Sequence, residues 1–399
     1  MSRLPLRPVL AVACLVGVAA AAAPGIASQV RADPPVQAAA LSAPVDSATA
    51  AGTSAGTSTA AGLPPARHVF VINLENKGYA TTFGANSPAT YLTKTLRPKG
   101  ALLTQYYGTA HNSLPNYIGQ ISGQGPNPVT QSDCQTFSDF VGGATVSPGQ
   151  AVGQGCVYPA SVKTLPDQLL NHGLTWKGYM DGMARGGDGR LCQHPAIGAV
   201  DETQRAEVGN QYAVRHNPFV YFHSIIDSPE CAKRDVPLFH LKTDLAKIST
   251  TANYSLITPD LCNDGHDSPC VDGRPGGLVT ADKFLRDVVP GILASPAFKR
   301  DGILVVTFDE SDSPQEDASA CCGEGPGPNS PMPGITGLGG GRIGAVVLSP
   351  FVTPGTTSTT PYNHYGLLAT IEDLFSLPRL GYAATVPARF GKDVFRTTS

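Results

Sequence analysis

Continuous apolar runs alternate with amphipathic segments through most of the chain. Residues 68–74 form an apolar run typical of a strand that is buried on both faces. Further strands are predicted over residues 174–180, 219–223, 254–259, 303–308 and 343–351. Between them, apolar residues recur at helical spacing over residues 165–172, 281–294 and 365–377. This alternation predicts an α/β fold, a three-layer αβα sandwich with a largely parallel central sheet.

The N-terminal end has the pattern of a secretory signal peptide. Two arginines precede an apolar run over residues 9–23, and small residues follow, with candidate cleavage points after Ala27 or Ala32. We therefore predict a signal peptide over residues 1–32. A membrane anchor is the alternative, although the run is shorter than the roughly 20 residues that a helical span needs. No other segment is long enough to cross a bilayer, so none is expected in the mature chain.

The segment that follows has the composition of a linker. Residues 33–64 are mostly Ala, Ser, Thr, Gly and Pro, with almost no charges or aromatic side chains. Such a segment cannot bury enough surface to fold, and we predict that it is disordered. The folded domain is predicted to span residues 65–399. We expect it to be secreted, to the extracellular space or into a cell envelope.

The composition narrows the class of protein. The 399 residues include 28 Lys and Arg against 31 Asp and Glu, a formal net charge of −3, and no basic block occurs. A nucleic-acid-binding protein would need a basic face for phosphate contacts, so no such partner is expected. The chain has 44 Gly and 35 Pro, which predicts many loops around a compact core.

Eight of the nine cysteines lie in the predicted domain. An even number in an exported protein favours disulfides. The sequence does not fix their pairing; the simplest local pairs are Cys134 with Cys156, Cys192 with Cys231 and Cys262 with Cys270, whereas the adjacent Cys321 and Cys322 are harder to place. A zinc site is the alternative, which we disfavour because no paired C-x-x-C spacing occurs.

Acidic and amide side chains follow two of the predicted strands. Glu75 and Asn76 come after the first strand, and Asp309 and Glu310 come after the strand that ends at residue 308. In parallel sheets, ligands bind beyond the carboxyl ends of the strands. Two carboxylate clusters at that edge would repel each other unless a cation lay between them, and a hard divalent metal ion is the natural partner. A helix N-cap or a solvated turn is the alternative for either cluster alone.

Ser113 lies where a helix is predicted to begin, with Pro115 tolerated in its first turn. Free backbone N–H groups and the positive end of the helix dipole favour an ionised hydroxyl at this position and attract a phosphate group. An ordinary serine N-cap is the alternative.

Three further segments carry histidine and aspartate. Asp264, His266 and Asp267 lie in one turn after a predicted strand, His216 precedes an Asn-Pro turn, and His364 begins the last amphipathic helix. Groups of this kind bind metals or transfer protons. A capping, turn or surface role is the alternative for each single histidine.

Taken together, these motifs resemble a bacterial phosphoesterase family that includes secreted acid phosphatases, phosphatidylinositol phosphatases and phospholipases C, within the alkaline phosphatase superfamily. The resemblance extends from about residue 68 to residue 377. It is carried by seven motifs in one order: Glu75-Asn76, His111-Asn-Ser-Leu-Pro-Asn-Tyr117, Arg215-His-Asn-Pro218, Asn263-Asp-Gly-His-Asp267, Thr307-Phe-Asp-Glu310, Val347-Leu-Ser-Pro-Phe-Val-Thr-Pro-Gly355 and Asn363-His-Tyr365.

The resemblance implies an alkaline-phosphatase-like sandwich and a metal-dependent phosphatase that acts through a phosphoserine. It implies a divalent metal ion, of undetermined identity and number, held by Glu75, Asn76, Asp309 and Glu310, with Ser113 as nucleophile and further ligand. Catalytic roles are implied for His111, His266 and His364. Residues implied to bind substrate or a second metal are Asn116, His216, Asp264 and Asp267.

The implied substrate is a small phosphomonoester or a phospholipid, with phosphoinositides included. Residues 75–79 and 176–179 are more similar to the acid phosphatase and phosphatidylinositol phosphatase branch than to the phospholipases C. Phospholipases C tend to continue the first motif with Arg-Ser-Phe-Asp-His, which is absent here. Gly78 and Gly265 depart from the family pattern and leave the branch open.

Three alternatives remain: a phospholipase C acting on phosphodiesters, an inactive secreted binding domain, and a metal-independent serine hydrolase, for which no G-x-S-x-G elbow surrounds Ser113. The oligomeric state is not predicted.

Overall fold

The computed structural model describes residues 62–184 and 189–396. The predicted signal peptide, over residues 1–32, and most of the predicted linker, over residues 33–64, lie outside this part of the chain. At the start of the described part, Leu63 is already buried against the core. None of the helices in these ranges combines the length and the apolar character that a membrane span requires.

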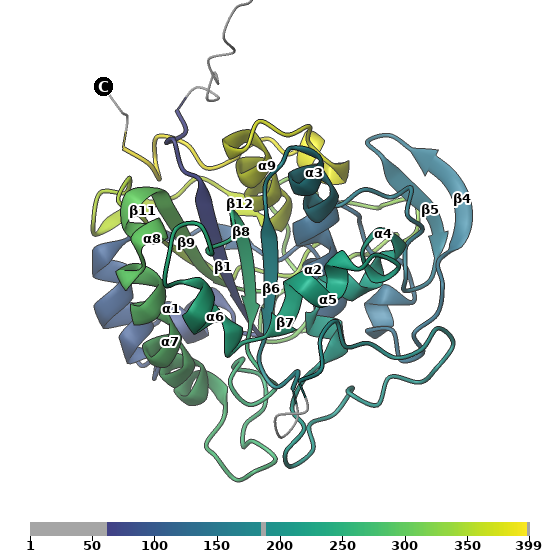
Figure 1. Cartoon of the computed structure of the whole chain (residues 1–399), viewed down its shortest axis with the longest axis horizontal. Coiled ribbons are helices and arrows are strands. Elements are labelled where there is room, and N and C mark those ends of the chain that lie inside the picture. The colour runs from purple at the N-terminus through teal and green to yellow at the C-terminus, as the bar shows by residue number, and fades with distance from the viewer. Residues whose placement is uncertain (1–61, 185–188, 397–399) are drawn as a thin grey trace, which may run out of the picture. The chain divides into compact units, whose positions relative to one another are not determined.

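A mostly parallel sheet forms the centre of the fold (Figure 1). Within the described ranges it has eight strands, in the order β11 (Thr356–Ser358), β2 (Ala101–Leu103), β10 (Ala345–Leu348), β9 (Gly302–Phe308), β1 (His68–Leu74), β8 (Tyr254–Thr258), β6 (Trp176–Met180) and β7 (Asp235–Pro237). Only β10 is reversed, since it pairs antiparallel with both β2 and β9 while the other strand pairs are parallel.

The central strands β1 and β9 fix the position of the candidate site. All seven residues of each strand are buried, as their continuous apolar runs predict. The two strands pair in parallel from His68 opposite Gly302 to Leu74 opposite Phe308. Their carboxyl ends therefore lie side by side, and the residues that follow them meet at one edge of the sheet. At the opposite edge His68 Nδ1 lies 2.6 Å from Asp301 Oδ1.

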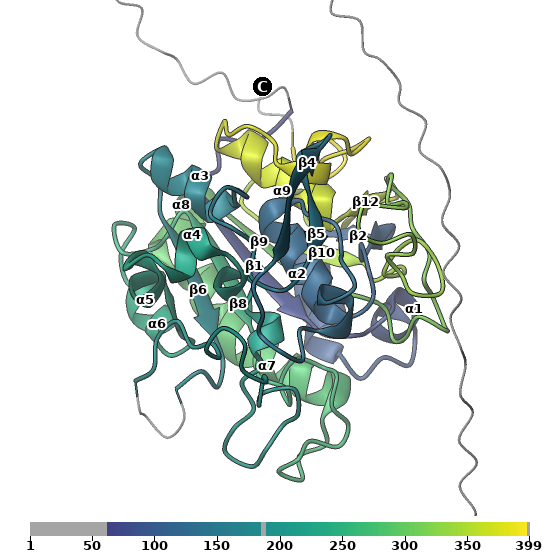
Figure 2. The same ribbon diagram turned by 90° about the vertical axis from the view of Figure 1, so that its right-hand side faces the viewer.

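Helices cover the sheet on both sides, with α6, α7 and α8 on one face and α2 and α9 on the other (Figures 1 and 2). The α-helices are α1 (Tyr79–Phe83), α2 (Ser113–Ser122), α3 (Leu165–Asn171), α4 (His223–Ile226), α5 (Glu230–Arg234), α6 (His240–Asp244), α7 (Gly277–Ala294), α8 (Pro296–Asp301) and α9 (His364–Leu374). Shorter helical turns are η1 (Leu92–Leu96), η2 (Arg97–Lys99), η3 (Thr130–Ser132), η5 (Val214–His216), η6 (Pro218–Tyr221) and η7 (Gly381–Ala384). The predicted α/β sandwich with a largely parallel sheet is confirmed.

Helix α2 is buried along its whole length. It begins at Ser113, as predicted, and ends at Ser122; the next residue, Gly123, caps it with a φ of 66°, in the left-handed region that favours glycine at a helix C-terminus. Two small sheets lie outside the main one: β3 (Tyr106–Tyr107) pairs with β12 (Tyr362–Asn363), and the exposed strand β4 (Val141–Val146) forms a hairpin with β5 (Gln150–Gln154), whose first two residues are buried.

The predicted strand over residues 219–223 is wrong. These residues belong to η6 and to the start of α4. Pro218 begins η6, and the side chain of Asn217 accepts a hydrogen bond from Phe219 N at 3.3 Å, which stabilises a helical turn. Phe219 packs in the core and stacks on Trp176 with 4.5 Å between ring centroids. The apolar run is thus buried without being a strand, a distinction that periodicity alone does not make.

The cysteines of the described part form four disulfides. The three local pairs are confirmed as Cys134–Cys156, Cys192–Cys231 and Cys262–Cys270, and the adjacent Cys321 and Cys322 pair with each other. The Cys262–Cys270 disulfide closes the loop that follows β8.

Candidate active site

Most of the predicted site residues lie at the edge of the sheet where β1, β8 and β9 end. Glu75 directly follows β1, Asp309 directly follows β9, and Asp264 lies in the loop after β8. Backbone hydrogen bonds hold these segments together: Glu75 N donates to Asp264 O at 2.9 Å, and Asp309 N donates to Leu74 O at 2.9 Å. All three carboxylates are buried. The parallel register of β1 and β9 thus produces the carboxylate cluster that the sequence predicts.

Ser113 faces this cluster from the first turn of α2. Its Oγ donates a hydrogen bond to Glu75 Oε2 at 2.7 Å. Tyr117, four residues later and therefore on the same face of the helix, donates from its hydroxyl to Glu75 Oε1. Asn112 occupies the N-cap position without a side-chain capping bond. The serine hydroxyl therefore lies at the positive end of a buried helix, in contact with a buried carboxylate.

A residue that sequence reasoning missed completes this helix start. Asp133 Oδ1 accepts a hydrogen bond from Leu114 N at 3.0 Å. Its other oxygen lies 4.0 Å from Arg215 Nε, and the next residue is the disulfide-bonded Cys134. Nothing in the sequence around Asp133 indicates this contact, because it depends on the path of a loop.

The second layer of contacts joins Asn76, Glu310 and His111. Asn76 N donates to Asp309 Oδ1 at 2.9 Å, and Asn76 Nδ2 donates to Glu310 Oε1 at 2.6 Å. To do so, Asn76 adopts a φ of 43°, which asparagine tolerates better than most residues. Nδ1 of His111 contacts the other oxygen of Glu310, and its Nε2 lies 3.1 Å from Asp317 O. Both oxygens of Glu310 therefore have protein partners.

His216 lies between two of the carboxylates. Its Nε2 is 3.4 Å from Glu75 Oε2, and its Nδ1 is 3.7 Å from Asp264 Oδ2. The ring stacks on Tyr117 with 5.3 Å between centroids and an interplanar angle of 13°. His216 is thus part of the buried cluster that faces Ser113.

Two predicted residues instead hold neighbouring backbone. His364 Nε2 lies 2.6 Å from Asp309 O and its Nδ1 lies 3.2 Å from Tyr106 Oη, so both ring nitrogens have buried partners. Asn116 accepts hydrogen bonds from the N–H groups of Thr109 and Ala110 at 2.8 and 3.0 Å, and it donates to Ala110 O at 2.8 Å. These contacts fix Asp309 and the loop before Ser113.

His266 and Asp267 lie at the surface beside the cluster. The backbone N–H of His266 donates to Asp264 Oδ1 at 2.8 Å, but its side chain is 49% exposed. His266 Nδ1 is 2.9 Å from Asp267 Oδ1. The structure therefore places this pair at the rim, whereas Glu75, Asp264 and Asp309 lie beneath it.

Burial dominates the electrostatics of the cluster. Burial, and then the nearby Asp309 and Asp264, raise the pKa of Glu75 well above its ordinary value. Burial also raises the pKa of Asp264 and of Asp309. It raises the pKa of Glu310 to about 8, although the contact with His111 acts in the opposite direction. The main cause of each shift in pKa is thus the removal of the carboxylate from water, which disfavours its charged form.

The donor set fits a hard divalent cation. Within this cluster, the buried oxygens Asn76 Oδ1, Asp264 Oδ2 and Asp309 Oδ2 have no hydrogen-bond partner among the described residues. Carboxylate and amide oxygens are the ligands that Mg²⁺ and Ca²⁺ prefer.

Three more compact sets of potential ligands occur in the described ranges. Each contains a disulfide whose sulfurs are not available as thiolates, and they are Cys192–Cys231 with Asp235, Cys262–Cys270 with Asp272, and Cys321–Cys322 with Glu324. These three sets are therefore not metal centres.

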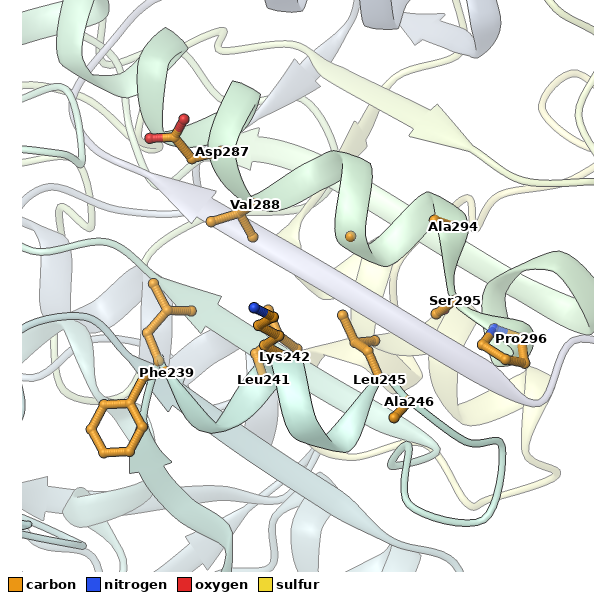
Figure 3. Close-up of a pocket in the computed structure, with 12 residues that line it drawn as sticks. Phe239, Leu241, Lys242, Leu245, Ala246, Asp287, Val288, Ala294, Ser295 and Pro296 are labelled. Atoms are coloured by element: carbon orange, nitrogen blue, oxygen red, sulfur yellow. The ribbon is translucent and has the colours of Figure 1, made fainter.

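A larger groove lies away from this cluster. It runs between α6 and α7, has a volume of about 650 Å³ and is lined mainly by apolar side chains, including Leu241, Leu245 and Val288 (Figure 3). None of the predicted site residues lines it.

Fold and site together define an αβα sandwich with a buried carboxylate cluster at the carboxyl edge of its sheet, next to the start of a buried helix. The chain belongs to the phosphoesterase family, whose model matches residues 82–378. The predicted family is thereby confirmed.

Curated relatives are about a quarter identical to the chain over the residues that align. A phosphate-repressible acid phosphatase of Penicillium chrysogenum is 26% identical over 287 residues, which cover 72% of this chain and 54% of the relative. A phosphatidylinositol-3-phosphatase of Mycobacterium tuberculosis is 25% identical over 328 residues, which cover 82% of this chain and 83% of the relative. The chain thus spans about half the length of the fungal acid phosphatases that it matches. Among solved structures, a protein in the alkaline phosphatase superfamily from Vibrio parahaemolyticus aligns with a TM-score of 0.44 and 13% identity, covering 82% of this chain and 72% of that one.

Proposed function

We propose that the protein is a metal-dependent phosphatase that hydrolyses phosphomonoesters through a phosphoserine at Ser113. The observation that carries this proposal is the position of Ser113 Oγ, at the start of a buried helix and 2.7 Å from Glu75 Oε2 in a carboxylate cluster. The names of the relatives support monoester substrates, since they are acid phosphatases and a phosphatidylinositol-3-phosphatase. Phosphoinositides are therefore among the substrates that we propose.

We also propose that the protein is secreted. In this proposal residues 1–32 are a signal peptide, residues 33–64 are a linker and residues 65–399 are the catalytic domain. The four disulfides support an oxidising destination, because disulfides persist mainly outside the reducing cytosol.

Glu75, Asp309 and Ser113 are the residues that we propose to hold a divalent cation, with the free Oδ1 of Asn76 as a further ligand. When bound, the cation would balance the buried carboxylates and favour the ionised form of the serine hydroxyl. Glu310, predicted as a ligand, is given a positioning role because both of its oxygens have protein partners. Asp264 and His216 are the candidates for a second ion or for contacts with substrate oxygens.

In the proposed reaction, Ser113 Oγ attacks the phosphorus atom while its proton moves toward Glu75 Oε2. The bond between phosphorus and the ester oxygen breaks, and the leaving oxygen takes a proton, which we assign to the exposed ring of His266. The N-terminal end of α2 stabilises negative charge on the phosphoryl oxygens. Water then attacks the phosphoserine, which releases inorganic phosphate and restores the Ser113 hydroxyl.

The other predicted residues have supporting roles in this scheme. His364 holds the backbone of Asp309, His111 holds Glu310, and Asn116 shapes the loop that leads to Ser113. Of the predicted histidines, His266 is the one with an exposed side chain beside the cluster, which is why we prefer it to His364 as the proton donor.

The test is hydrolysis of p-nitrophenyl phosphate from pH 4 to pH 9, with and without a chelator. We expect Ser113→Ala to reduce kcat by about 10³-fold or more, as removal of a nucleophile does. Ser228→Ala, a serine outside the cluster, is the matched control and should retain activity. Chelation should abolish activity, and added Mg²⁺, Mn²⁺, Ca²⁺ or Zn²⁺ should restore it. Mass spectrometry after an acid quench should detect phosphate on the peptide that contains Ser113.

Full activity of Ser113→Ala would refute the phosphoserine mechanism. Faster hydrolysis of bis(p-nitrophenyl) phosphate than of the monoester would favour the phospholipase C alternative. Inactivity of the folded, cation-supplied protein on both esters would favour the binding-domain alternative.

A further inference from the structure

We propose that a cationic pocket beside Ser113 binds a second anionic group on the alcohol part of the substrate. This inference rests on the proposed function and specifies its substrate class. The substrates would be phosphomonoesters whose leaving alcohol carries another phosphate or a carboxylate. The pocket is named here the Arg205 pocket, and its defining residues are Gln204, Arg205, Arg215, His266, Ser268 and Val271.

The Arg205 pocket adjoins the carboxylate cluster on the surface side. Its volume is about 490 Å³, and it lies between the segment around residue 205 and the loop that follows β8. Two of its residues connect it directly to the cluster. The backbone of His266 binds Asp264 Oδ1 at 2.8 Å, and Arg215 immediately precedes His216. A group held in this pocket would therefore be close to the end of the substrate that leaves.

The pocket carries a net positive charge. Arg205 is exposed, and no carboxylate among the described residues pairs with its guanidinium group. Arg215 adds a second guanidinium to the lining, but its Nη1 donates to backbone carbonyls and its Nε forms an ion pair with Asp133 Oδ2 at 4.0 Å, so Arg205 is the cation of the pocket that has no carboxylate partner. The single carboxylate among the described lining residues is Asp267, which already lies 2.9 Å from His266 Nδ1. A buried or bound anion is attracted to such an excess of charge.

The wall that carries Arg205 is fixed by side-chain contacts. The N–H and hydroxyl of Thr203 donate to Asp201 Oδ1 at 2.8 and 2.7 Å. Gln204 Nε2 donates to Asp133 O at 2.8 Å, and Arg215 Nη1 donates to the carbonyls of Thr203 and Gln204, at 3.3 Å each. The backbone that presents Arg205 is therefore held in place, and this reduces the ordering cost of binding.

The opposite wall is fixed as well. The Cys262–Cys270 disulfide closes the loop after β8. Gln211 Nε2 donates to Asp272 Oδ2 at 3.0 Å, which ties this loop to the segment beyond Arg205. The two walls come from separate segments of the chain, and contacts hold each of them in place. The pocket is therefore preorganised, unlike a place where exposed side chains meet by chance.

Arginine is suited to phosphate and carboxylate recognition because its planar guanidinium can donate two parallel hydrogen bonds. The pocket recognises the charge and shape of the second anion, and this chemistry is shared by a soluble bisphosphate and by a phosphorylated lipid headgroup. Substrates without a second anion would use the cluster around Ser113 alone.

The experiment compares phenyl phosphate with 4-carboxyphenyl phosphate, two esters that differ only in the second anion. We expect Arg205→Gln to lower the ratio of kcat/KM for the carboxylated ester to that for phenyl phosphate by about tenfold, the effect of one lost charged hydrogen bond. Arg205→Lys should retain most of the ratio because it keeps the charge. Arg97→Gln, an exposed arginine in η2 outside the pocket, is the matched control and should leave the ratio as in the wild type.

An unchanged ratio in Arg205→Gln would overturn the proposal. An equal fall in kcat/KM for both esters would also overturn it, because Arg205 would then act on the reacting phosphate or on the fold. Failure of the proposed function would be seen separately, as phenyl phosphate hydrolysis that survives in Ser113→Ala. Two further arms identify the source of the anion: inositol 1,3-bisphosphate in solution, and phosphatidylinositol 3-phosphate in phosphatidylcholine vesicles. If Arg205→Gln lowers kcat/KM for both substrates, the pocket recognises a free anion as well as a lipid headgroup. If it lowers kcat/KM only for the vesicles, the pocket recognises the headgroup.

Discussion

Replacing Glu372 with glutamine is expected to make the stability of the domain less sensitive to rising pH. Glu372 lies in α9 and is fully buried. Its Oε1 accepts a hydrogen bond from Leu380 N at 2.9 Å, whereas its Oε2 has no hydrogen-bond partner in the described part of the chain. Burial raises the pKa of Glu372 from 4.5 to about 9. A neutral amide of nearly the same shape would keep the bond to Leu380 and would not titrate.

The size of the effect follows from this shift in pKa. Between pH 4.5 and pH 9 the folded protein holds a proton that the unfolded chain has released, so the free energy of unfolding falls as the pH rises. Each pKa unit corresponds to about 1.4 kcal/mol, so the wild type should lose about 2–3 kcal/mol between pH 5 and pH 7 through this group. Glu372→Gln should not show this loss. The variant should therefore resemble the wild type near pH 5 and become relatively more stable above it.

Urea unfolding at pH 5, 6, 7 and 8, followed by far-UV circular dichroism with the disulfides intact, measures this difference. Subtracting the wild-type curve cancels the titration of all other groups that the two proteins share. Glu316→Gln is the matched control, because Glu316 is exposed. If the free energy of unfolding of Glu372→Gln differs from that of the wild type by the same amount from pH 5 to pH 8, the reasoning is refuted.

Three further predictions concern the helix start and the cluster. Asp133→Asn should lower kcat on p-nitrophenyl phosphate about fivefold, because it weakens a capping bond worth about 1 kcal/mol next to Ser113; steady-state kinetics that match the wild type would contradict this role. Tyr117→Phe should lower the free energy of unfolding in urea by about 1–3 kcal/mol, because it leaves an oxygen of buried Glu75 without its hydrogen-bond donor. An unchanged urea midpoint would count against the hydrogen bond between Tyr117 and Glu75. Chelation should lower the melting temperature of the wild-type protein by several degrees, as loss of any ligand specific to the folded state does; a melting curve that is identical with and without chelator would count against a bound cation.

The core of the fold was predictable because its strands are uniformly apolar. The sequence predicts β1 and β9 almost to the residue, and it also predicts that their carboxyl ends carry the polar groups. The short strands β2, β7 and β11, with three residues each, were not predicted, because so short a segment has no periodicity to read. At residues 219–223 a local Asn-Pro turn outweighed the apolar run.

The candidate site was predictable where it depends on strand ends and hidden where it depends on loops. Glu75 and Asp309 meet because their strands pair in register. The contact between Asp133 and Leu114 joins residues 19 apart through a loop, and no local pattern indicates it. The bond from Tyr117 to Glu75 was within reach of sequence reasoning, because Tyr117 is one helical turn beyond Ser113. The sequence likewise could not show that His364 has both ring nitrogens occupied.

The pairing of β1 with β9 also sets when the site can form. Asn76 and Asp309 are 233 residues apart, as are His68 and Asp301 at the other end of the same two strands. Both partners of β1, the strands β8 and β9, follow it by more than 170 residues, so an emerging chain exposes the apolar β1 segment during the synthesis of much of the domain. Domains dominated by such distant contacts fold slowly and are prone to aggregate on the way. The proposed site includes Asp309, so it can form only after residue 309 has been synthesised, and the proposed activity should appear only late in folding.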